Sequence, residues 1–196
     1  MEKKYKLTEE TTNVDGITLY RIEALIDFGD VKEGDKGGFV EGNKNLSHEG
    51  NCWVYGNAIV CGNARVYGKA EIYGNARVYS NAKVYGNAEV YEDALVYEDA
   101  KVCGNAEVWG NAEVCGNATI TSDSDYIIFK NWWSSGRFFT WTRSNDMWKV
   151  GCFYGTGKEL VEKAYKDSEL SGREYKRVVD YVESVLKEML NNINEN

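Results

Sequence analysis

Residues 54–119 read VYGNAI VCGNAR VYGKAE IYGNAR VYSNAK VYGNAE VYEDAL VYEDAK VCGNAE VWGNAE VCGNAT. The stretch contains eleven hexads in unbroken register, from Val54 to Thr119. The first position of every hexad is Val or Ile, and the fifth is always Ala. A period this strict is typical of a repeat architecture, so it decides the fold before any other feature is considered.

The hexad pattern indicates a short strand followed by a corner. Side chains alternate along a strand, so Ala and Val share one side while the variable residue and the aromatic share the other. Gly adopts positive φ freely and Asn tolerates it, which suits the Gly-Asn pair to a turn. One hexad buries nothing by itself, whereas stacked coils continue a common core. A β-hairpin meander fits less well, because the corners lack longer or primed loops.

Three hexads per coil give a triangular prism with eighteen residues per turn. The sequence therefore predicts a mainly β protein built on a triangular parallel β-helix. An interior of Val, Ile and Ala is expected to be narrow and dry, without room for a ligand. Val40 and Leu46 are six residues apart and are expected to begin the stack, before a two-residue insertion that precedes Val54.

Folding the sequence at eighteen residues sorts the outward side chains into three walls. The basic wall contains Arg65, Tyr67, Lys83, Tyr85, Lys101 and Cys103. The acidic wall contains Glu71, Tyr73, Glu89, Tyr91, Glu107 and Trp109. The mixed wall contains Ile59, Cys61, Arg77, Tyr79, Leu95, Tyr97, Glu113 and Cys115.

Two of these walls stack like charges at the usual strand spacing of about 4.8 Å, which is unfavourable in isolation. Solvent screening and splayed side chains are one explanation. Another is a partner: the basic wall of one copy meets the acidic wall of the next, and the contact closes as a homotrimer with parallel axes. A third is an anionic ligand at a subunit seam, with Tyr stacking on a base and Arg or Lys holding phosphate. The predicted ligand-binding residues of this wall are Arg65, Tyr67, Lys83, Tyr85 and Lys101.

The segment before the repeat, residues 1–39, is predicted to form an N-terminal cap. Residues 5–11 and 17–28 alternate apolar and polar side chains around Asn-Val-Asp-Gly, which favours a β-hairpin that covers the first open coil. Residues 29–42 are expected to form a connecting loop, and their acidic side chains lack the spacing of an EF-hand. The solenoid is assigned to residues 40–121.

The composition changes after Thr121, and residues 122–196 are predicted to form a small α+β domain. Residues 126–133, 137–143 and 147–154 read as three strands, with hairpin turns at residues 134–136 and 144–146. A capping box from Thr156 to Glu159 begins a short helix that ends near Lys166. A second helix is expected from about Gly172 to Leu190, because its valines and leucine have helical spacing.

This domain contains more aromatic side chains than one face of a sheet needs. Alternation would send neighbouring rings to opposite faces, so we expect some to cover the last coil and to contact neighbouring subunits. The alternative is an aromatic platform that holds a nucleotide by stacking and charge. The ligand-binding residues predicted for it are Trp132, Trp133, Arg137, Trp141, Arg143 and Lys149.

Composition excludes several classes of protein. Of the 196 residues, 43% are hydrophobic and 28% are charged, which is atypical of a disordered or membrane-embedded chain. The net charge of −8 argues against general nucleic-acid coating. The start, Met-Glu-Lys-Lys-Tyr-Lys, lacks a signal-peptide core, and five cysteines without CxxC fit free thiols in the cytoplasm. His48 is the one histidine, so a three-histidine metal site is excluded and no metal or cofactor is expected.

Several segments together resemble phage and prophage proteins with Gly-Asn-Ala hexapeptide repeats, within the hexapeptide left-handed β-helix superfamily. They are the opening Tyr-Lys-Leu-Thr, then Leu-Tyr-Arg-Ile-Glu-Ala-Leu, Gly-Gly-Phe-Val-Glu, the repeat array, and Thr-Trp-Thr, Val-Gly-Cys-Phe and Glu-Leu in the tail. The resemblance covers almost the whole chain. It implies a left-handed coil, a viral or prophage origin and a place in the cytoplasm of the host cell.

Two non-catalytic functions follow from these features. The first is a phage-encoded trimer that sequesters a nucleotide-like host defence signal and so serves immune evasion. The second is a stiff trimeric scaffold that presents the C-terminal domain to a host protein. Hexapeptide acyltransferases resemble this chain in the repeat alone, and they usually use a catalytic His and an excursion loop. Here no insertion interrupts residues 54–119, and His48 precedes them, so acyl transfer is the weaker alternative.

Overall fold

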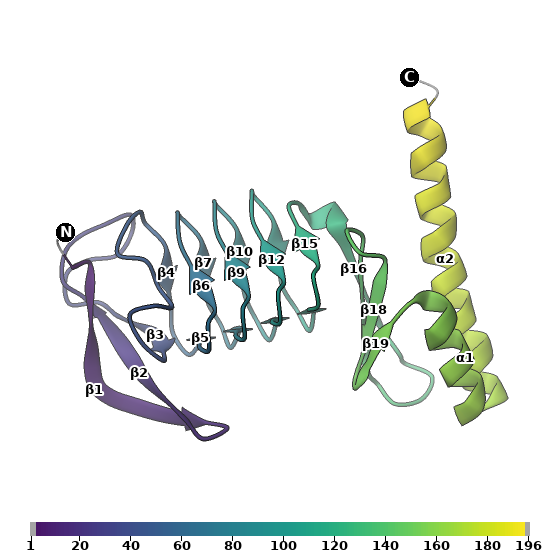
Figure 1. Ribbon diagram of the computed structural model, residues 1–196, viewed down its shortest axis with the longest axis horizontal. Helices are drawn as coiled ribbons and strands as arrows, with labels where there is room; N and C mark the ends of the chain where they lie inside the picture. Colours follow the sequence, from purple (N-terminus) through teal and green to yellow (C-terminus); the bar gives the residue numbers. More distant parts are fainter. Residues whose placement is uncertain (1–2, 195–196) are drawn as a thin grey trace.

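The computed structural model describes residues 3–194. Residues 1–2 of the predicted cap and residues 195–196 of the predicted C-terminal domain lie outside the described residues. Along the long axis of Figure 1 the chain forms a hairpin, a stack of coils, an antiparallel sheet and two helices. The coils form a parallel β-solenoid of stacked three-sided turns, so the predicted fold class is confirmed. Among residues 3–194, no helix is both long and apolar enough to cross a membrane.

Three parallel ladders form the sides of the solenoid, and each contains one of the walls. The mixed wall is built from β5 (Ile59–Val60), β8 (Arg77–Val78), β11 (Leu95–Val96) and β14 (Glu113–Val114). The acidic wall is built from β4 (Trp53–Val54), β7 (Glu71–Ile72), β10 (Glu89–Val90) and β13 (Glu107–Val108). The basic wall is built from β6 (Arg65–Val66), β9 (Lys83–Val84), β12 (Lys101–Val102) and β15 (Thr119–Ile120).

The register along every ladder of the array is eighteen residues, as the repeat predicts. Val66 pairs with Val84 and Val84 pairs with Val102, while Arg65, Lys83 and Lys101 pair in the same way. The Val or Ile at the first position of each hexad and the Ala at the fifth are fully or almost fully buried throughout the array. The inward set is therefore continuous, and each coil packs on the last through Val or Ile and Ala side chains.

The stack begins before the array, at the positions that the sequence predicts. Val40 pairs with Val60, and Leu46 forms a bridge with Val66. Both offsets are twenty residues instead of eighteen, which places the two-residue insertion between Leu46 and Val54.

The expectation of a loop over residues 29–42 is wrong in part, because β3 (Lys36–Val40) lies between the hairpin and β5. A Cβ on Gly37 would lie 2.5 Å from the carbonyl oxygen of Val54, so glycine here permits a close strand contact.

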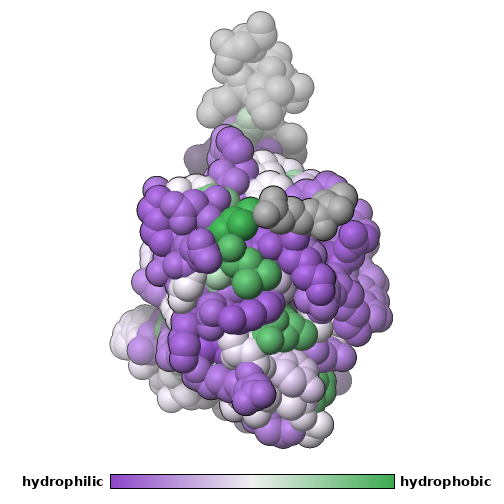
Figure 2. Space-filling model, turned by 90° about the vertical axis from the view of Figure 1, so that its left-hand side faces the viewer, coloured by the Kyte–Doolittle hydropathy of each residue, from purple (hydrophilic) through white to green (hydrophobic). Residues whose placement is uncertain are grey.

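The N-terminal end is closed by the predicted hairpin, formed by β1 (Tyr5–Val14) and β2 (Ile17–Ala24). Its strands continue the sheet of the mixed wall in the order β1-β2-β3-β5. Tyr5 and Ile22 pack into the core of the solenoid, and the Lys4 ammonium group donates to the carbonyl oxygen of Cys52 at 2.7 Å. Viewed from this end, the surface is mostly hydrophilic with a short apolar band, so the buried aliphatic column is covered (Figure 2).

The C-terminal sheet contains four strands where the sequence predicted three. They are β16 (Tyr126–Lys130), β17 (Phe138–Thr142), β18 (Met147–Val150) and β19 (Phe153–Gly155), paired as antiparallel neighbours. The third predicted strand divides because Gly151 turns the chain at positive φ. The first predicted strand ends at Lys130, because the Asn131 side chain accepts a hydrogen bond from the backbone of Ser134 and starts a turn.

The sheet closes the last coil through side-chain oxygens. Within the array, the N–H before each buried Val donates to an Ala carbonyl seventeen residues ahead, as from Lys83 to Ala100. The last coil has no such successor. Its N–H groups at Glu107, Glu113 and Thr119 donate instead to side-chain oxygens. The acceptors are Asp123 in the short 3-10 helix η1 (Asp123–Asp125), Thr140 in β17 and Ser144.

Two helices cover the other face of this sheet (Figure 1). Helix α1 (Gly157–Asp167) begins with the predicted capping box: Thr156 Oγ1 accepts from the Glu159 N–H, and Glu159 Oε2 accepts from the Thr156 N–H. Helix α2 spans Glu169–Asn194 and begins three residues before the expected start. The aromatic residues of the sheet pack against these helices in a second core, whose buried members are Phe139, Trp141, Trp148, Val150, Leu160, Val179 and Val182.

Candidate functional site

The basic wall presents its three cations in a row. Arg65, Lys83 and Lys101 occupy matched positions of β6, β9 and β12 and are exposed. Within the described part of the chain, none of the three forms an ion pair with a carboxylate. Tyr67 and Tyr85 stack beside them with ring centroids 4.9 Å apart and planes 1° from parallel. The wall therefore has unneutralised positive charge along one side of a stacked aromatic pair.

On the acidic wall, the outward charges of successive coils are joined to tyrosines by hydrogen bonds. The hydroxyl of each Tyr on this wall donates to the Glu of the following coil: Tyr73 to Glu89 at 2.6 Å and Tyr91 to Glu107 at 2.9 Å. Burial and the neighbouring Glu89 carboxylate raise the pKa of Glu71. The acidic charges are thus held in internal hydrogen bonds, whereas the side chains of Arg65, Lys83 and Lys101 have no comparable partners among residues 3–194.

The first coil places a hollow of about 180 Å³ at the beginning of the basic wall. Two of the predicted ligand-binding residues, Arg65 and Tyr67, line it. None of its lining side chains is a carboxylate, and the polar ones are mainly donors. The lining residues are Asn43, Lys44, Leu46, Ser47, His48, Arg65, Val66 and Tyr67. Lys44 also forms a 3.5 Å ion pair with Glu41, outside this lining. Such a set of donors suits an anion.

His48 is fixed in this hollow by two contacts. Its Nδ1 accepts a hydrogen bond from the Lys4 backbone N–H at 3.2 Å, and its ring stacks on Tyr5 with centroids 4.3 Å apart. Partial burial and the neighbouring positive charges of Lys4 and Lys3 lower its pKa, which favours the neutral imidazole. Because Nδ1 is the acceptor, the proton of the neutral ring lies on Nε2, and that nitrogen is a donor.

Tyr67 is the first ring of its stack. Leu46 pairs with Val66, and the Ser47 N–H donates to the Val66 carbonyl, so Ser47 lies next to Tyr67 in the preceding coil. A serine has no ring to continue the stack. The face of Tyr67 opposite Tyr85 is therefore turned toward the hollow, where a planar group has a surface on which to stack.

The predicted residues of the C-terminal domain do not come together on one surface. Trp141 is 2% exposed and packs under the helices, so it is not available to a ligand. Trp132 is 84% exposed but lies in the turn after β16, and Trp133 contacts Phe139 and Tyr175.

Two of the three cations of the predicted platform lie near each other at Gly151, because the Lys149 ammonium donates to its carbonyl oxygen and the Arg137 side chain lies beside it, whereas no contact joins Arg143 to them among residues 3–194. Lys149 also lies 3.7 Å from the Glu113 carboxylate of the solenoid. The Arg143 backbone N–H bonds to Asp125 at the start of the sheet. The aromatic platform is therefore not formed, because alternation along β17 directs Phe139 and Trp141 into the helix-facing core.

The sequence interpretation did not include four side chains of the hollow: Asn43, Lys44, Ser47 and His48. The signal that identifies them is the two-residue insertion. Counting back twenty residues instead of eighteen from Arg65 and Tyr67 leads to Asn45 and Ser47, in the middle of this segment. Among residues 3–194, no group of three or more His, Cys, Asp or Glu side chains is arranged to hold a metal ion.

No family model matches the chain. One curated relative is named an uncharacterized acetyltransferase, YdcK, of Escherichia coli (strain K12), and the two proteins are 39% identical over 61 residues. The match covers 27% of this chain and 19% of the relative, so the chain spans about a fifth of that protein's length. The stacked solenoid and this match fit the hexapeptide β-helix superfamily.

Proposed function

We propose that the protein is a non-catalytic binding protein that captures a nucleotide-like anion at the beginning of its basic wall. The observation that carries the proposal is the donor-lined hollow, which Arg65, Lys44 and His48 line together with Tyr67. The cations and the imidazole N–H would hold the phosphate, and Tyr67 would stack on the base. Lys83 and Lys101 continue the positive surface toward the next coils.

The assembly that we propose is a homotrimer with parallel axes. Two walls of each copy carry opposite charges, and they lie on different sides of the prism. Contact between the basic wall of one copy and the acidic wall of the next repeats around a threefold axis and closes. The hollow would then lie at a subunit seam. With the viral origin that the sequence resemblance implies, the function would be the sequestration of a host defence signal in the host cytoplasm.

Titration calorimetry with AMP, ADP, cyclic mono- and dinucleotides and inorganic phosphate tests the proposal. We expect a nucleotide to bind, and Arg65→Gln to weaken it about tenfold or more because a charge-assisted hydrogen bond is lost. Lys166→Gln is the matched control, since it removes an exposed cation from α1. If no nucleotide binds at millimolar concentration, or if both variants bind as the unchanged protein does, the proposal is wrong.

Acyl transfer is a second candidate because of the name of the curated relative. Against it, a general base needs a lone pair that reaches the substrate, and the lone pair of neutral His48 is used by the Lys4 N–H. Incubation with acetyl-CoA and a panel of amine and sugar acceptors distinguishes the two candidates. Release of free CoA that is lost in His48→Asn would favour the enzyme over the binding protein.

The scaffold alternative uses the other end of the molecule. The C-terminal domain lies at the far end of the solenoid from the hairpin, which is suited to presentation to a host protein (Figure 1). Recovery of one host protein by the full chain, but not by a Trp132→Ser variant of its exposed turn, would support the scaffold. Such a result without nucleotide binding would favour it over sequestration.

A further inference from the structure

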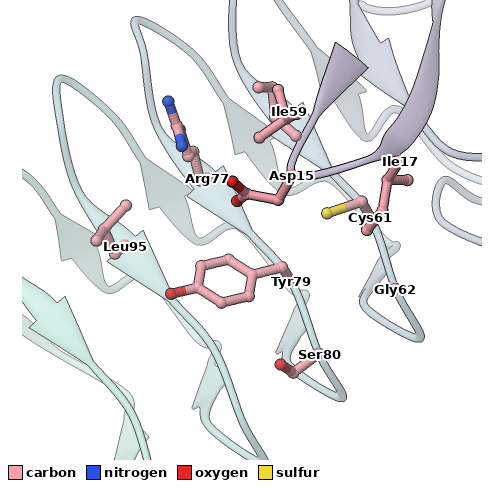
Figure 3. Close-up of a pocket in the computed structure, with 10 residues that line it drawn as sticks. Asp15, Ile17, Ile59, Cys61, Gly62, Arg77, Tyr79, Ser80 and Leu95 are labelled. Atoms are coloured by element: carbon pink, nitrogen blue, oxygen red, sulfur yellow. The ribbon is translucent and has the colours of Figure 1, made fainter.

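A second concavity lies on the mixed wall, where the tip of the hairpin overhangs the first coils (Figure 3). Its volume is about 340 Å³. Asp15 and Ile17 come from the hairpin, while Ile59, Arg77, Tyr79 and Leu95 come from three successive coils. The groove is separate from the donor-lined hollow, which lies on the basic wall.

The hairpin is held over this wall by several independent contacts. Leu19, Phe39 and Ile59 form a small buried cluster between the hairpin and the wall. The Arg21 guanidinium group lies over the Phe39 ring and donates to the carbonyl oxygens of Gly37 and Gly56 at 2.7 and 3.0 Å. Glu10 bonds to Arg21 at 2.6 Å. The groove is therefore formed in advance of binding, which lowers the entropic cost of taking up a ligand.

The floor of the groove arises from two departures from the repeat. Cys61 stands where Tyr79 and Tyr97 stand in the next two coils, and the missing ring leaves space beside Ile59. Leu95 stands where a Glu would meet the hydroxyl of the preceding Tyr, as Glu89 meets Tyr73 and Glu113 meets Tyr97. In the structure as described, the Tyr79 hydroxyl has no protein partner, and Figure 3 shows it beside Leu95.

Two opposite charges lie above this apolar floor. Arg77 projects from the wall between Ile59 and Leu95, and the Asp15 carboxylate extends from the hairpin tip on the same side of the groove mouth (Figure 3). They form no ion pair with each other, and neither forms one with another side chain in residues 3–194. A ligand with one negative and one positive group could satisfy both.

We propose that this groove binds a small zwitterion with an apolar side chain, such as a free hydrophobic amino acid. The carboxylate would pair with Arg77, the ammonium group would pair with Asp15, and the side chain would lie on Ile17, Ile59 and Leu95. A nucleotide suits the groove poorly, because Asp15 repels phosphate. Burial and Glu41 raise the pKa of Cys61, so the thiol stays protonated and binding is non-covalent. The mixed wall faces outward in the proposed trimer, so the groove stays open.

The test compares L-phenylalanine and L-leucine with N-acetyl-L-phenylalanine, which lacks the ammonium group, and L-phenylalaninamide, which lacks the carboxylate. Titration calorimetry and ligand-observed NMR measure the affinity for the full chain. We expect phenylalanine to bind at least tenfold more tightly than either derivative. In the Arg77→Gln variant, phenylalanine should bind no more tightly than phenylalaninamide. In the Asp15→Asn variant, phenylalanine should bind no more tightly than N-acetylphenylalanine. Both residues are exposed, and circular dichroism checks that the variants fold.

Lys166→Gln, which removes an exposed cation from α1, is the matched control and should leave amino-acid binding unchanged. Failure of nucleotide binding leaves this expectation intact, because the two sites share no residue. Equal affinity for all four compounds, or no binding at millimolar concentration, would overturn the proposal. A change of oligomeric mass in Arg77→Gln or Asp15→Asn would also contradict it, since a second copy would then occupy the groove.

Discussion

The phenolic hydroxyl of Tyr73 donates to Oε2 of Glu89 at 2.6 Å, sixteen residues ahead in a chain whose coils repeat every eighteen. Each Tyr of the acidic wall thus bonds to a Glu of the next coil, which lies two residues before the Tyr of that coil. The same bond joins Tyr55 to Glu71 and Tyr91 to Glu107. The stacked rings and these bonds make the acidic wall a continuous ladder, which links the stability of the solenoid to the protonation of its tyrosines and glutamates.

The first prediction is alkaline unfolding. Burial and the Glu107 carboxylate raise the pKa of Tyr91 to about 12, whereas an unfolded tyrosine ionises near pH 10. A raised folded-state pKa contributes stability below the unfolded pKa, and this contribution is lost as pH rises through the folded value. Stability should therefore fall between about pH 10 and 12. Circular dichroism should show the loss of structure over this range, and stability that stays constant from pH 10 to 12 would contradict this.

The second prediction concerns Glu71. Its raised pKa means that the folded state binds the proton more tightly than the unfolded state, so the charged form costs stability at neutral pH. Glu71→Gln keeps an acceptor for Tyr55 and removes the repulsion from Glu89. We expect a gain of a few tenths of a kcal/mol, which raises the melting temperature by roughly 1–2 °C. The gain should vanish below about pH 4, and an equal gain at all pH values would exclude the charge as its cause.

The third prediction concerns a corner where glycine is replaced. Glu92 adopts a φ of +57°, and at most corners of the solenoid the residue with this conformation is Gly. Glu92→Gly should stabilise the protein by about 0.5–1 kcal/mol, because a side chain is strained in this region. Glu98 has the same φ, but its carboxylate also accepts from the Gly116 N–H. Glu98→Gly should therefore gain less, and denaturant unfolding of both variants makes the comparison; the opposite order would refute the explanation.

The fourth prediction concerns the closure of the last coil. Thr140 Oγ1 accepts from the Glu113 N–H at 2.9 Å, and Thr140 is buried. Thr140→Val keeps the volume but leaves that N–H without a partner, which should cost about 1–3 kcal/mol in the free energy of unfolding. Ser124→Ala, in exposed η1, is the control and should cost less than about 0.5 kcal/mol. Equal effects of the two variants would show that the bond does not close the coil.

The fifth prediction is the oligomeric state. Light scattering should give three times the mass of one chain at micromolar concentration. Lys83→Glu should weaken the assembly by placing like charges across the seam, and the addition of Glu89→Lys should restore it, because the two walls then exchange signs in that coil. Glu89→Lys also removes the acceptor of the Tyr73 hydroxyl, so circular dichroism checks that the double variant folds. A monomer under the same conditions, or a folded double variant that assembles no better than the single one, would remove the trimer.

The repeat predicted the solenoid because its signal is redundant. A strict Val and Ala pattern such as that around Val66 and Val84 has one arrangement that buries every aliphatic side chain, and any slip would expose it. The same arithmetic placed Arg65, Lys83 and Lys101 on one wall. The repeat did not predict β3. Glycines in residues 29–42 favour a loop unless another backbone lies close to them, and the close approach of that backbone arises only in the folded coil.

By itself, the sequence determined the period, the three walls and the charge of each, since these depend on the alternation of neighbouring side chains. Tertiary structure alone decided that Trp141 is buried, that His48 lies beside Arg65, and that Asp15 overhangs Arg77. Such contacts join segments whose separation follows no period, so their geometry depends on how the caps pack against the ends of the stack. The local sequence pattern therefore determines the contacts that recur from coil to coil, whereas tertiary packing determines the contacts that occur once.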